Sequence, residues 1–331
     1  MPGQPGGGKG QYRDGSAGER VHILYIGGTG RTGSTLLTAM LGQYQQFFPA
    51  GELAFLWRFG LLDAGKCGCG LLLRECPVWG SILTDAYGDV SKVDAAELFR
   101  LRKRFNSKHM PLMVTRGLRQ RLLQRAGDFP STVERLYHGI ASATDSRVIV
   151  DSSKEPHYSY ILRSRPSLDV FFLHLVRDPR AVAHSWRAHH KKETGLSYDS
   201  WMESRGPVVS STYFDVSNVA AELMWSHWHD RYLFLRYEDF LADPTSTLRR
   251  IGRFVGEDID PSQIMTDGRV DLNPSHTAWG NPKRFELGSV QLEPDEAWRS
   301  KMPRKERLAV TALTFPFIKR YHYPITVDHA D

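Results

Sequence analysis

A glycine-rich turn near the N-terminus combines residue types that bind anions. Residues 23–26 are mostly apolar and predict a buried strand, and a second apolar run after the turn predicts a helix. Between them, Gly28 to Thr35 nearly spells the nucleotide P-loop, in which backbone N–H groups at a helix N-terminus hold phosphate. Ser34 occupies the lysine position of that motif, and a cation, Arg31, lies three residues earlier. The sequence therefore predicts an anion site without the lysine that is diagnostic of ATP or GTP hydrolysis.

A second candidate anion site follows a later strand. Residues 169–176 are almost wholly apolar, as expected for a buried parallel strand, and Arg177 lies at its carboxyl end. Ser185 lies two turns into the helix that follows, so both side chains can face one anion. Arginine offers a fork of donors that matches phosphate oxygens. Asp178 suits the N-cap of this helix, and Pro179 suits its first position.

Both segments resemble motifs of the sulfotransferases that use 3′-phosphoadenosine 5′-phosphosulfate (PAPS). The 5′-phosphosulfate loop of that family is [KR]-[ST]-G-[ST]-[ST], and residues 31–35 are Arg-Thr-Gly-Ser-Thr. The 3′-phosphate motif is a strand ending in Arg with a helical Ser eight residues on, a pattern that residues 173–185 follow. Asp-Ser-Ser-Lys at residues 151–154 and Gly-Asn-Pro-Lys-Arg at residues 280–284 resemble the carbohydrate-type and bacterial branch. The four motifs stand in the order of the family.

The resemblance implies an enzyme that moves a sulfuryl group from PAPS to a hydroxyl or amine. The acceptor would be a small molecule, a glycolipid or a carbohydrate, and the second product would be adenosine 3′,5′-bisphosphate. Two alternatives remain open on the residues alone. One is an ATP-dependent kinase with a degenerate P-loop, and the other is a nucleotide-binding protein without catalytic activity.

The resemblance also implies two phosphate sites. The N–H groups of residues 32–35, with the hydroxyls among them, would hold the 5′-phosphate. Arg177 and Ser185 would hold the 3′-phosphate, and Arg284 would close over it. Tyr237 lies where related sequences place an adenine-contacting tyrosine, and a core aromatic at a strand end is an equal interpretation. The residues implied to bind the cofactor are Arg31, Thr32, Gly33, Ser34, Thr35, Leu36, Arg177, Ser185, Tyr237 and Arg284.

Three residues are candidates for the chemical step. Arg31 matches the catalytic Lys/Arg position of the family and would stabilise charge on the leaving oxygen. The acceptor also needs a general base, and the histidine used by small-molecule sulfotransferases is absent at the matching place. Asp151 is the nearest carboxylate and our first choice, although an aspartate that caps the following helix is an equal interpretation. Lys154 would contact the sulfonate or the acceptor, while Glu52 and His184 are lower-ranked bases.

The elements that must position these residues alternate between strand and helix. That order predicts an α/β fold with a P-loop-like parallel sheet flanked by helices on both faces. Ligands bind at the carboxyl ends of such strands, where both phosphate motifs lie. A helix is expected to begin after Asp243 and to end near Gly256, and another, over residues 303–321, is expected to end or kink at Pro316. The predicted strands cover residues 23–26, 147–151, 169–176 and 232–237.

Helical insertions are predicted in residues 52–145 and are expected to form the acceptor pocket. We expect its walls to come from residues 52–75, from residues 190–225 and from the segment 276–279. No motif identifies the acceptor. Eight tryptophans and thirteen tyrosines permit stacking against a sugar or an aromatic ring and do not choose between the two.

The composition is that of a globular protein. The chain has 331 residues, so we expect one domain over residues 21–325 that follows a disordered glycine-rich tail, residues 1–20. The net charge of +6 suits a bis-anionic cofactor and does not argue for nucleic acid. No apolar run approaches the length of a membrane span, and the lack of an N-terminal anchor favours a cytoplasmic enzyme. The oligomeric state stays open.

Three cysteines lie within ten residues: Cys67, Cys69 and Cys76. A turn with small buried thiols is the plainest interpretation. A zinc site with a fourth ligand and a local disulfide are the alternatives. The spacing C-x-C-x₆-C is not a standard zinc pattern, and no histidine lies nearby along the chain, so no metal site is predicted.

Overall fold

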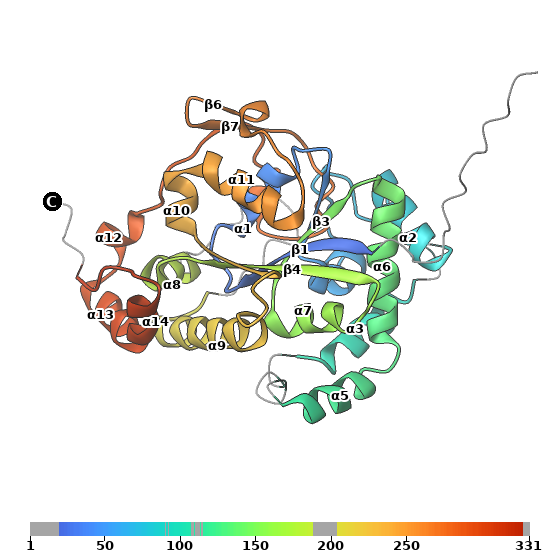
Figure 1. The fold of residues 1–331 in the computed structure, drawn as a ribbon, viewed down its shortest axis with the longest axis horizontal. Helices are drawn as coiled ribbons and strands as arrows, with labels where there is room; N and C mark the ends of the chain where they lie inside the picture. Colours follow the sequence, from blue (N-terminus) through green and yellow to red (C-terminus); the bar gives the residue numbers. More distant parts are fainter. Residues whose placement is uncertain are drawn as a thin grey trace, which may run out of the picture.

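A five-stranded parallel sheet forms the centre of the structure (Figure 1). This computed structural model describes residues 20–89, 91, 93–106, 109, 113, 115–187 and 204–326, so nearly all of the predicted tail lies outside the described residues. The strand order is β2-β3-β1-β4-β5. Its strands are β1 (Val21–Gly28), β2 (Phe47–Gly51), β3 (Val148–Lys154), β4 (Leu168–Val176) and β5 (Tyr232–Arg236).

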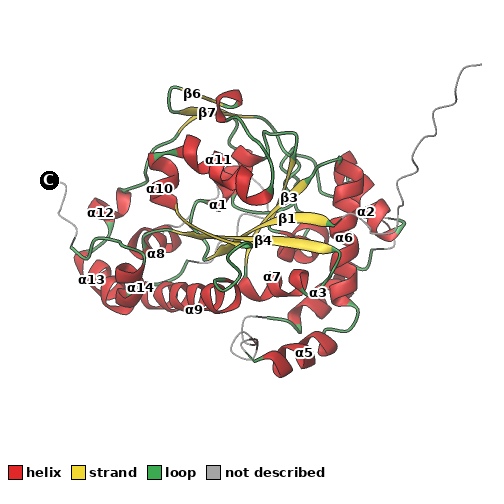
Figure 2. Ribbon diagram, viewed as in Figure 1, coloured by secondary structure: helices red, strands yellow, loops and turns green. Residues whose placement is uncertain are grey.

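The predicted α/β architecture is confirmed, because helices cover both faces of this sheet (Figure 2). Side chains alternate along β1, so that Leu24 and Ile26 enter one core while Ile23 and Tyr25 enter the other. The first core is covered by α1 (Ser34–Leu41), α10 (Tyr237–Ala242) and α11 (Pro244–Val255). The second core is covered by α6 (Phe129–Thr144), α7 (Pro156–Arg163) and α9 (Pro207–Trp225).

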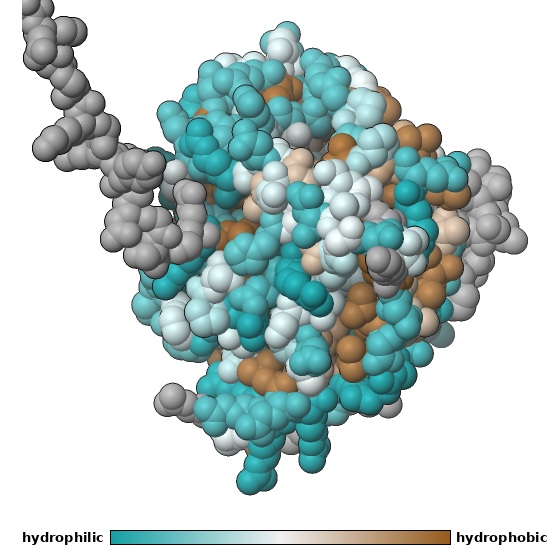
Figure 3. Space-filling view, turned by 90° about the vertical axis from the view of Figure 1, so that its right-hand side faces the viewer, coloured by the Kyte–Doolittle hydropathy of each residue, from teal (hydrophilic) through white to brown (hydrophobic). Residues whose placement is uncertain are grey.

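The segment between β2 and β3 is helical, as predicted. It begins with the 3₁₀-helix η1 (Leu53–Phe55) and the π-helix η2 (Leu56–Leu62), which lead away from the carboxyl end of β2. The remaining helices pack on the second core or at its edge: α2 (Pro77–Tyr87), α3 (Ala95–Lys103), α5 (Arg116–Arg125) and α6. Figure 3 views the molecule from the side of these helices, where hydrophilic residues cover most of the face and hydrophobic residues form smaller patches among them.

The C-terminal part contains both predicted helix signals. Asp243 accepts a hydrogen bond from the Ser246 backbone N–H and caps α11, which ends at Gly256 in a left-handed conformation. The predicted helix around Pro316 is interrupted at Thr314, because proline cannot continue the hydrogen-bond ladder. The helices here are α8 (Pro179–Arg187), α12 (Ala297–Lys301), α13 (Arg304–Leu313) and α14 (Phe315–Arg320). Across the described ranges, every helix is too short or too polar to span a bilayer.

Several short elements were not predicted. The edge strand β2 contains Pro49, and proline within an apolar run weakens a strand signal. A three-stranded antiparallel sheet lies above the first core (Figure 1). Its strands are β6 (Met265–Thr266), β7 (Arg269–Leu272) and β8 (Gly288–Gln291). The 3₁₀-helix η6 (Pro261–Gln263) precedes β6, and the 3₁₀-helix η7 (Pro282–Phe285) lies between β7 and β8.

Candidate functional site

A cavity of about 760 Å³ opens at the carboxyl ends of the central strands. In the sheet, β2 and β3 lie on one side of β1, and β4 and β5 lie on the other, so the strand order changes direction at β1. Open α/β sheets bind ligands where the strand order reverses in this way. Most of the predicted site residues line this cavity: Arg31, Gly33, Ser34, Thr35, Leu36, Lys154, Arg177, Ser185 and Tyr237.

The loop after β1 turns tightly because two glycines permit it. Gly28 has φ of 125°, and a Cβ there would lie 2.7 Å from the Leu175 carbonyl oxygen. Gly33 has φ of 84°, and a Cβ there would lie 2.2 Å from a ring carbon of Tyr237. The Tyr237 ring therefore packs directly on the loop, at the N-cap of α1.

The N-terminus of α1 points its free donors into the cavity. The first intrahelical bond runs from the Leu37 N–H to the Gly33 carbonyl at 3.2 Å, so the N–H groups of residues 34–36 have no partner within the helix. The helix dipole adds partial positive charge at the same place. Thr32 is buried, and its hydroxyl donates to the Thr29 carbonyl at 3.3 Å, so this side chain holds the turn rather than lining the cavity.

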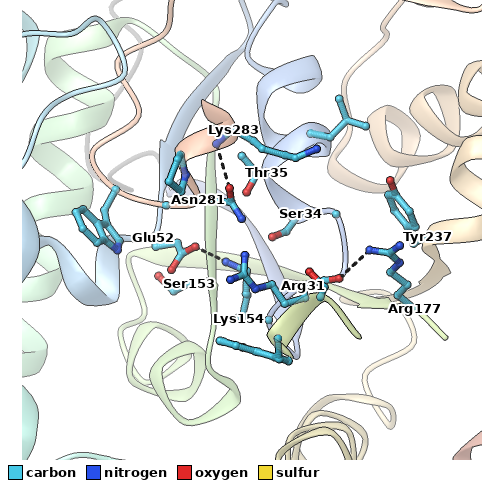
Figure 4. Close-up of a pocket in the computed structure, with 18 of the residues that line it drawn as sticks. Arg31, Ser34, Thr35, Glu52, Ser153, Lys154, Arg177, Tyr237, Asn281 and Lys283 are labelled. Atoms are coloured by element: carbon cyan, nitrogen blue, oxygen red, sulfur yellow. Dashed lines mark hydrogen bonds and ion pairs between the residues drawn. The ribbon is translucent and has the colours of Figure 1, made fainter. Parts of the chain in front are cut away.

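Arg31 lies in the middle of the site, with Glu52 and Lys154 on one side and Arg177 and Tyr237 on the other (Figure 4). Its backbone adopts φ of 71°. Burial, together with a nearby arginine, lowers the pKa of Arg31 to about 10 although Glu52 acts to raise it, so the guanidinium stays charged at neutral pH.

An aromatic ring that the motifs did not indicate supports this cation. The Arg31 guanidinium lies 4.9 Å from the ring centre of Trp186, and Arg205 lies 4.3 Å from the same ring. A buried cation–π contact of this kind is worth about 1–2 kcal/mol. Trp186 follows Ser185 directly, and no motif marks it as part of the site.

Arg177 forms the second cationic point of the cavity. It is buried at the end of β4, where it lies 4.9 Å from the Tyr237 ring centre and donates to the Arg31 carbonyl at 3.4 Å. It also donates to the Asp295 carboxylate at 3.1 Å and to the carbonyl of the same residue at 2.9 Å. Burial would raise the pKa of Asp295, but the charge and hydrogen bond of Arg177 hold that pKa below its usual value. Ser185 lies on the same cavity wall, as predicted.

The capping predicted for the helix after β4 is confirmed. The Asp178 carboxylate accepts a hydrogen bond from the Arg180 backbone N–H at 2.9 Å, and Pro179 is the first residue of α8. The Arg180 guanidinium binds the same carboxylate at 2.7 Å and 2.9 Å. These bonds fix the first turn of α8, the helix that carries Ser185.

Of the three candidate bases, Glu52 and His184 line the cavity and Asp151 does not. Glu52 follows β2 and forms an ion pair with Lys154, which ends β3. Asp151 is completely buried behind them and is not among the cavity-lining residues; it accepts hydrogen bonds from the Tyr137 hydroxyl and from Ser153. Burial raises the pKa of Asp151 to about 6, against the lowering effect of these hydrogen bonds. Asp151 thus has the position of a residue that holds the wall in place.

Arg284 also lies beside the main cavity rather than on its wall. It is buried, and it donates to the Gly280 carbonyl at 2.6 Å and to the Lys66 carbonyl at 3.3 Å. It lines a small neighbouring cavity of about 10 Å³. From the same turn, Asn281 and Lys283 face the main cavity (Figure 4).

The far side of the cavity is aromatic and draws on each segment expected to form the acceptor pocket. Phe59 on η2 stacks on Trp279 with ring centres 4.5 Å apart and planes at 14°. Tyr213 on α9 lines the same space, and part of the predicted segment 190–225 lies outside the described residues. Arginines lie on these rings as well, with Arg58 4.8 Å from the Phe59 ring centre and Arg205 4.6 Å from the Tyr213 ring centre, so cationic and aromatic side chains share this wall.

The cysteines lie next to a histidine that is distant in the sequence, His276. The prediction that no histidine lies near them is wrong in space, because His276 Nδ1 lies 3.3 Å from the Cys76 sulfur and 3.8 Å from the Cys67 sulfur. All three cysteines are free thiols, so the local disulfide is not formed.

The family model and the curated relatives that match this chain all belong to the sulfotransferases. Residues 24–310 match the family described as "Sulfotransferase domain". Carbohydrate sulfotransferase 5 of Mus musculus is 29% identical over 158 residues, which cover 44% of this chain and 39% of that protein. Carbohydrate sulfotransferase 4 of Mus musculus is 35% identical over 114 residues, covering 31% of this chain and 29% of that protein. The chain thus spans well under half the length of these curated relatives.

A solved structure supports the same fold. The "Sulfotransferase Domain from the Curacin Biosynthetic Pathway" superimposes with a TM-score of 0.51 at 19% identity, covering 93% of this chain and 100% of that one. At this identity the match shows the fold alone.

Proposed function

Because this chain belongs to the sulfotransferase family, we propose that it transfers a sulfuryl group from PAPS to a hydroxyl or amine of an acceptor. The observation that carries the proposal is the pairing of two cationic points in one cavity. One is the α1 N-terminus with Arg31, and the other is Arg177 at the end of β4. A nucleotide with both a 5′- and a 3′-phosphate matches two such points.

The residues present fit this donor. The free N–H groups of residues 34–36 and the hydroxyls of Ser34 and Thr35 suit the 5′-phosphosulfate. Arg177 and Ser185 suit the 3′-phosphate, which would compete with Asp295 for the Arg177 guanidinium. The adenine would lie near Tyr237, whose ring is also in contact with the Arg177 guanidinium.

Arg284 takes a different role in this proposal from the one the motif implies. Its donors bind the carbonyls of Gly280 and Lys66, so it shapes the turn that presents Asn281 and Lys283 to the cavity. Lys283 then supplies the cation from this turn.

The chemical step needs a stabilised leaving oxygen and a base. PAPS supplies the sulfuryl group, and its departure leaves negative charge on the bridging oxygen. Arg31 and the α1 N–H groups are fixed donors at that place before the reaction begins, which is how preorganised charge lowers a barrier. Glu52 lines the cavity beside Lys154, and we assign it the acceptor proton. Lys154, paired with Glu52, orients it.

The aromatic and polar groups of the cavity wall suit a sugar acceptor. Phe59 and Trp279 supply aromatic surface to the wall, while Glu52 and Lys154 offer hydrogen bonds to sugar hydroxyls. The two curated relatives named above are carbohydrate sulfotransferases, which supports the same acceptor class.

The test is transfer from PAPS to a panel of sugar, lipid and phenolic acceptors, with both products detected by mass spectrometry. The wild-type chain is expected to sulfate at least one sugar. Arg31→Ala is expected to reduce the rate by roughly 10²–10³-fold, the size of effect seen when one oxyanion donor is removed. The matched control is Arg100→Ala, which removes an exposed arginine of α3 paired with Glu97. Failure of wild-type transfer to every acceptor, or equal rates for the two variants, would overturn the assignment.

A further inference from the structure

Three cysteines and one histidine from distant parts of the chain meet next to the cavity wall. Cys67, Cys69 and Cys76 belong to the segment between η2 and α2, and His276 belongs to the segment that leads to Trp279. Their four potential ligand atoms all lie within 4.8 Å of one another.

Three of the six distances between these ligand atoms match one tetrahedral ion. Zn–S bonds of about 2.3 Å and Zn–N bonds of about 2.0 Å place tetrahedral ligands about 3.8 Å apart for two sulfurs and about 3.6 Å for sulfur and nitrogen. The Cys69 and Cys76 sulfurs are 3.8 Å apart, and His276 Nδ1 is 3.3 Å from Cys76 Sγ and 3.8 Å from Cys67 Sγ. A disulfide would need about 2.05 Å.

The backbone already holds the ligands in place. The Cys67 N–H donates to the Leu71 carbonyl and the Gly70 N–H donates to the Cys67 carbonyl, both at 2.8 Å, so the first two cysteines lie on a tight turn. Cys76 immediately precedes α2, and Trp79 on that helix donates its indole N–H to the His276 carbonyl at 2.6 Å. Cys67 and Cys76 are buried, as is typical of closed metal sites.

We propose that Cys67, Cys69, Cys76 and His276 bind one zinc ion that acts structurally. Four protein ligands leave no open position for a substrate or a water, and a Cys₃His set is among the structural zinc sites. Soft thiolates also disfavour magnesium and calcium. The ion would join two segments that are about 200 residues apart in sequence.

The segment that carries His276 leads to Trp279 on the cavity wall, and the cysteine segment is hydrogen-bonded to it, which gives the ion its role. The Gly68 N–H donates to the Thr277 carbonyl at 2.9 Å, and the Glu52 N–H donates to the Trp279 carbonyl at 3.0 Å. The backbone carbonyl of Lys66, directly before the first cysteine, accepts a hydrogen bond from the Arg284 guanidinium. The zinc ion would therefore stabilise residues 276–279, whose hydrogen bond to the Glu52 N–H positions both Glu52 and Trp279.

The experiment measures metal and thiols in the purified full chain, without an activity assay. Elemental analysis is expected to give one zinc per chain, and His276→Ala and Cys69→Ser are each expected to lose most of it. The matched control, His227→Gln, changes a histidine at the end of α9 outside the cluster and is expected to retain the zinc. Because the chain has only three cysteines, a thiol reagent reports on the cluster alone. The thiols are expected to react slowly until a strong chelator removes the ion, and that removal is expected to lower Tm by several degrees.

If a variant fails to fold, the metal content of the wild-type chain still tests the proposal. A wild-type protein without zinc that also fails to bind added Zn²⁺ or Co²⁺ would overturn the proposal. So would zinc that persists in His276→Ala, or a Cys69–Cys76 disulfide detected as a loss of two hydrogens in the intact mass. None of these outcomes depends on PAPS binding, so the sulfotransferase proposal stands or falls separately.

Discussion

At the scale of single residues, the site depends on which side chains the strand ends expose. Asp151 and Lys154 lie on the same strand, yet the aspartate is enclosed by Tyr137 and Ser153 while the lysine enters the cavity. Glu52 meets that lysine from the neighbouring strand end. The resemblance to the family favoured Asp151 as the base, whereas the geometry favours Glu52.

Two substitutions separate these roles. Glu52→Gln keeps the size of the side chain and removes its basicity, so kcat is expected to fall by roughly 10²–10⁴-fold, the usual range for a general base. Binding of adenosine 3′,5′-bisphosphate is expected to change little. Asp151→Asn is expected mainly to lower Tm, because its partners are structural. Steady-state kinetics with a thermal melt of each variant makes the comparison. A normal Tm with a larger kcat loss in Asp151→Asn would return the base to Asp151.

The motif residues were predictable because their spacing is local. Arg31 lies three residues after β1 and Arg177 directly follows β4, so the strand ends place them at one edge of the sheet. Trp186 and Asp295 were not predictable, since each becomes part of the site through a contact with a distant segment. His276 shows the same limit, because it lies 200 residues from Cys76 in sequence and 3.3 Å away in space.

At the scale of elements, the loop between β1 and α1 is the most demanding part of the fold. Gly28 and Gly33, at its two ends, both have positive φ, and the Tyr237 ring packs against Gly33. Strand and helix could be predicted on either side of it, because each has an apolar pattern of its own. The edge strand β2 and the small sheet β6-β7-β8 could not, since their few residues carry weak or interrupted patterns.

Gly33→Ala tests that requirement. The new Cβ would lie 2.2 Å from the Tyr237 ring, at a backbone φ of 84° that costs a residue with a side chain about 1–2 kcal/mol. We expect a lower Tm and at least a tenfold loss of affinity for adenosine 3′,5′-bisphosphate, on the order of 1.4 kcal/mol. Gly80→Ala on α2 is the control, because a Cβ there meets nothing within 4 Å and alanine favours a helix. Unchanged nucleotide binding by Gly33→Ala would mean that the loop is not the phosphate site.

At the scale of the whole molecule, the two cores on either side of the sheet depend on buried polar groups as well as apolar ones. His174 on β4 is completely buried and hydrogen-bonded to Asn218 on α9 and to the Tyr232 hydroxyl, each at 2.7 Å. Burial lowers the pKa of His174 to about 4, although the hydrogen bond that the ring donates to Asn218 Oδ1 acts to raise it. The neutral ring is therefore part of the native packing between sheet and helix.

This histidine makes stability depend on pH in a definite direction. Its native pKa lies below the unfolded value, so the unfolded chain binds the extra proton first and stability is lost as pH falls from 6.5 towards 4. At pH 5 the loss is about 2 kcal/mol. His174→Gln removes this titration, so its destabilisation relative to the wild type should shrink by about that amount between pH 7 and pH 5. Urea unfolding at both pH values measures the difference, and an equal gap at both would show that His174 does not titrate on unfolding.

The most direct measurement for the account as a whole is calorimetric titration with adenosine 3′,5′-bisphosphate, with ATP·Mg²⁺ in parallel. Two cationic points in one cavity predict tight binding of the bisphosphate and weak binding of ATP·Mg²⁺. Arg177→Ala is expected to weaken the bisphosphate by roughly 10–100-fold, as for the loss of a charged hydrogen bond, and to spare adenosine 5′-phosphosulfate, which lacks the 3′-phosphate. Tighter binding of ATP·Mg²⁺ than of the bisphosphate, or unchanged binding by Arg177→Ala, would contradict the proposed donor site.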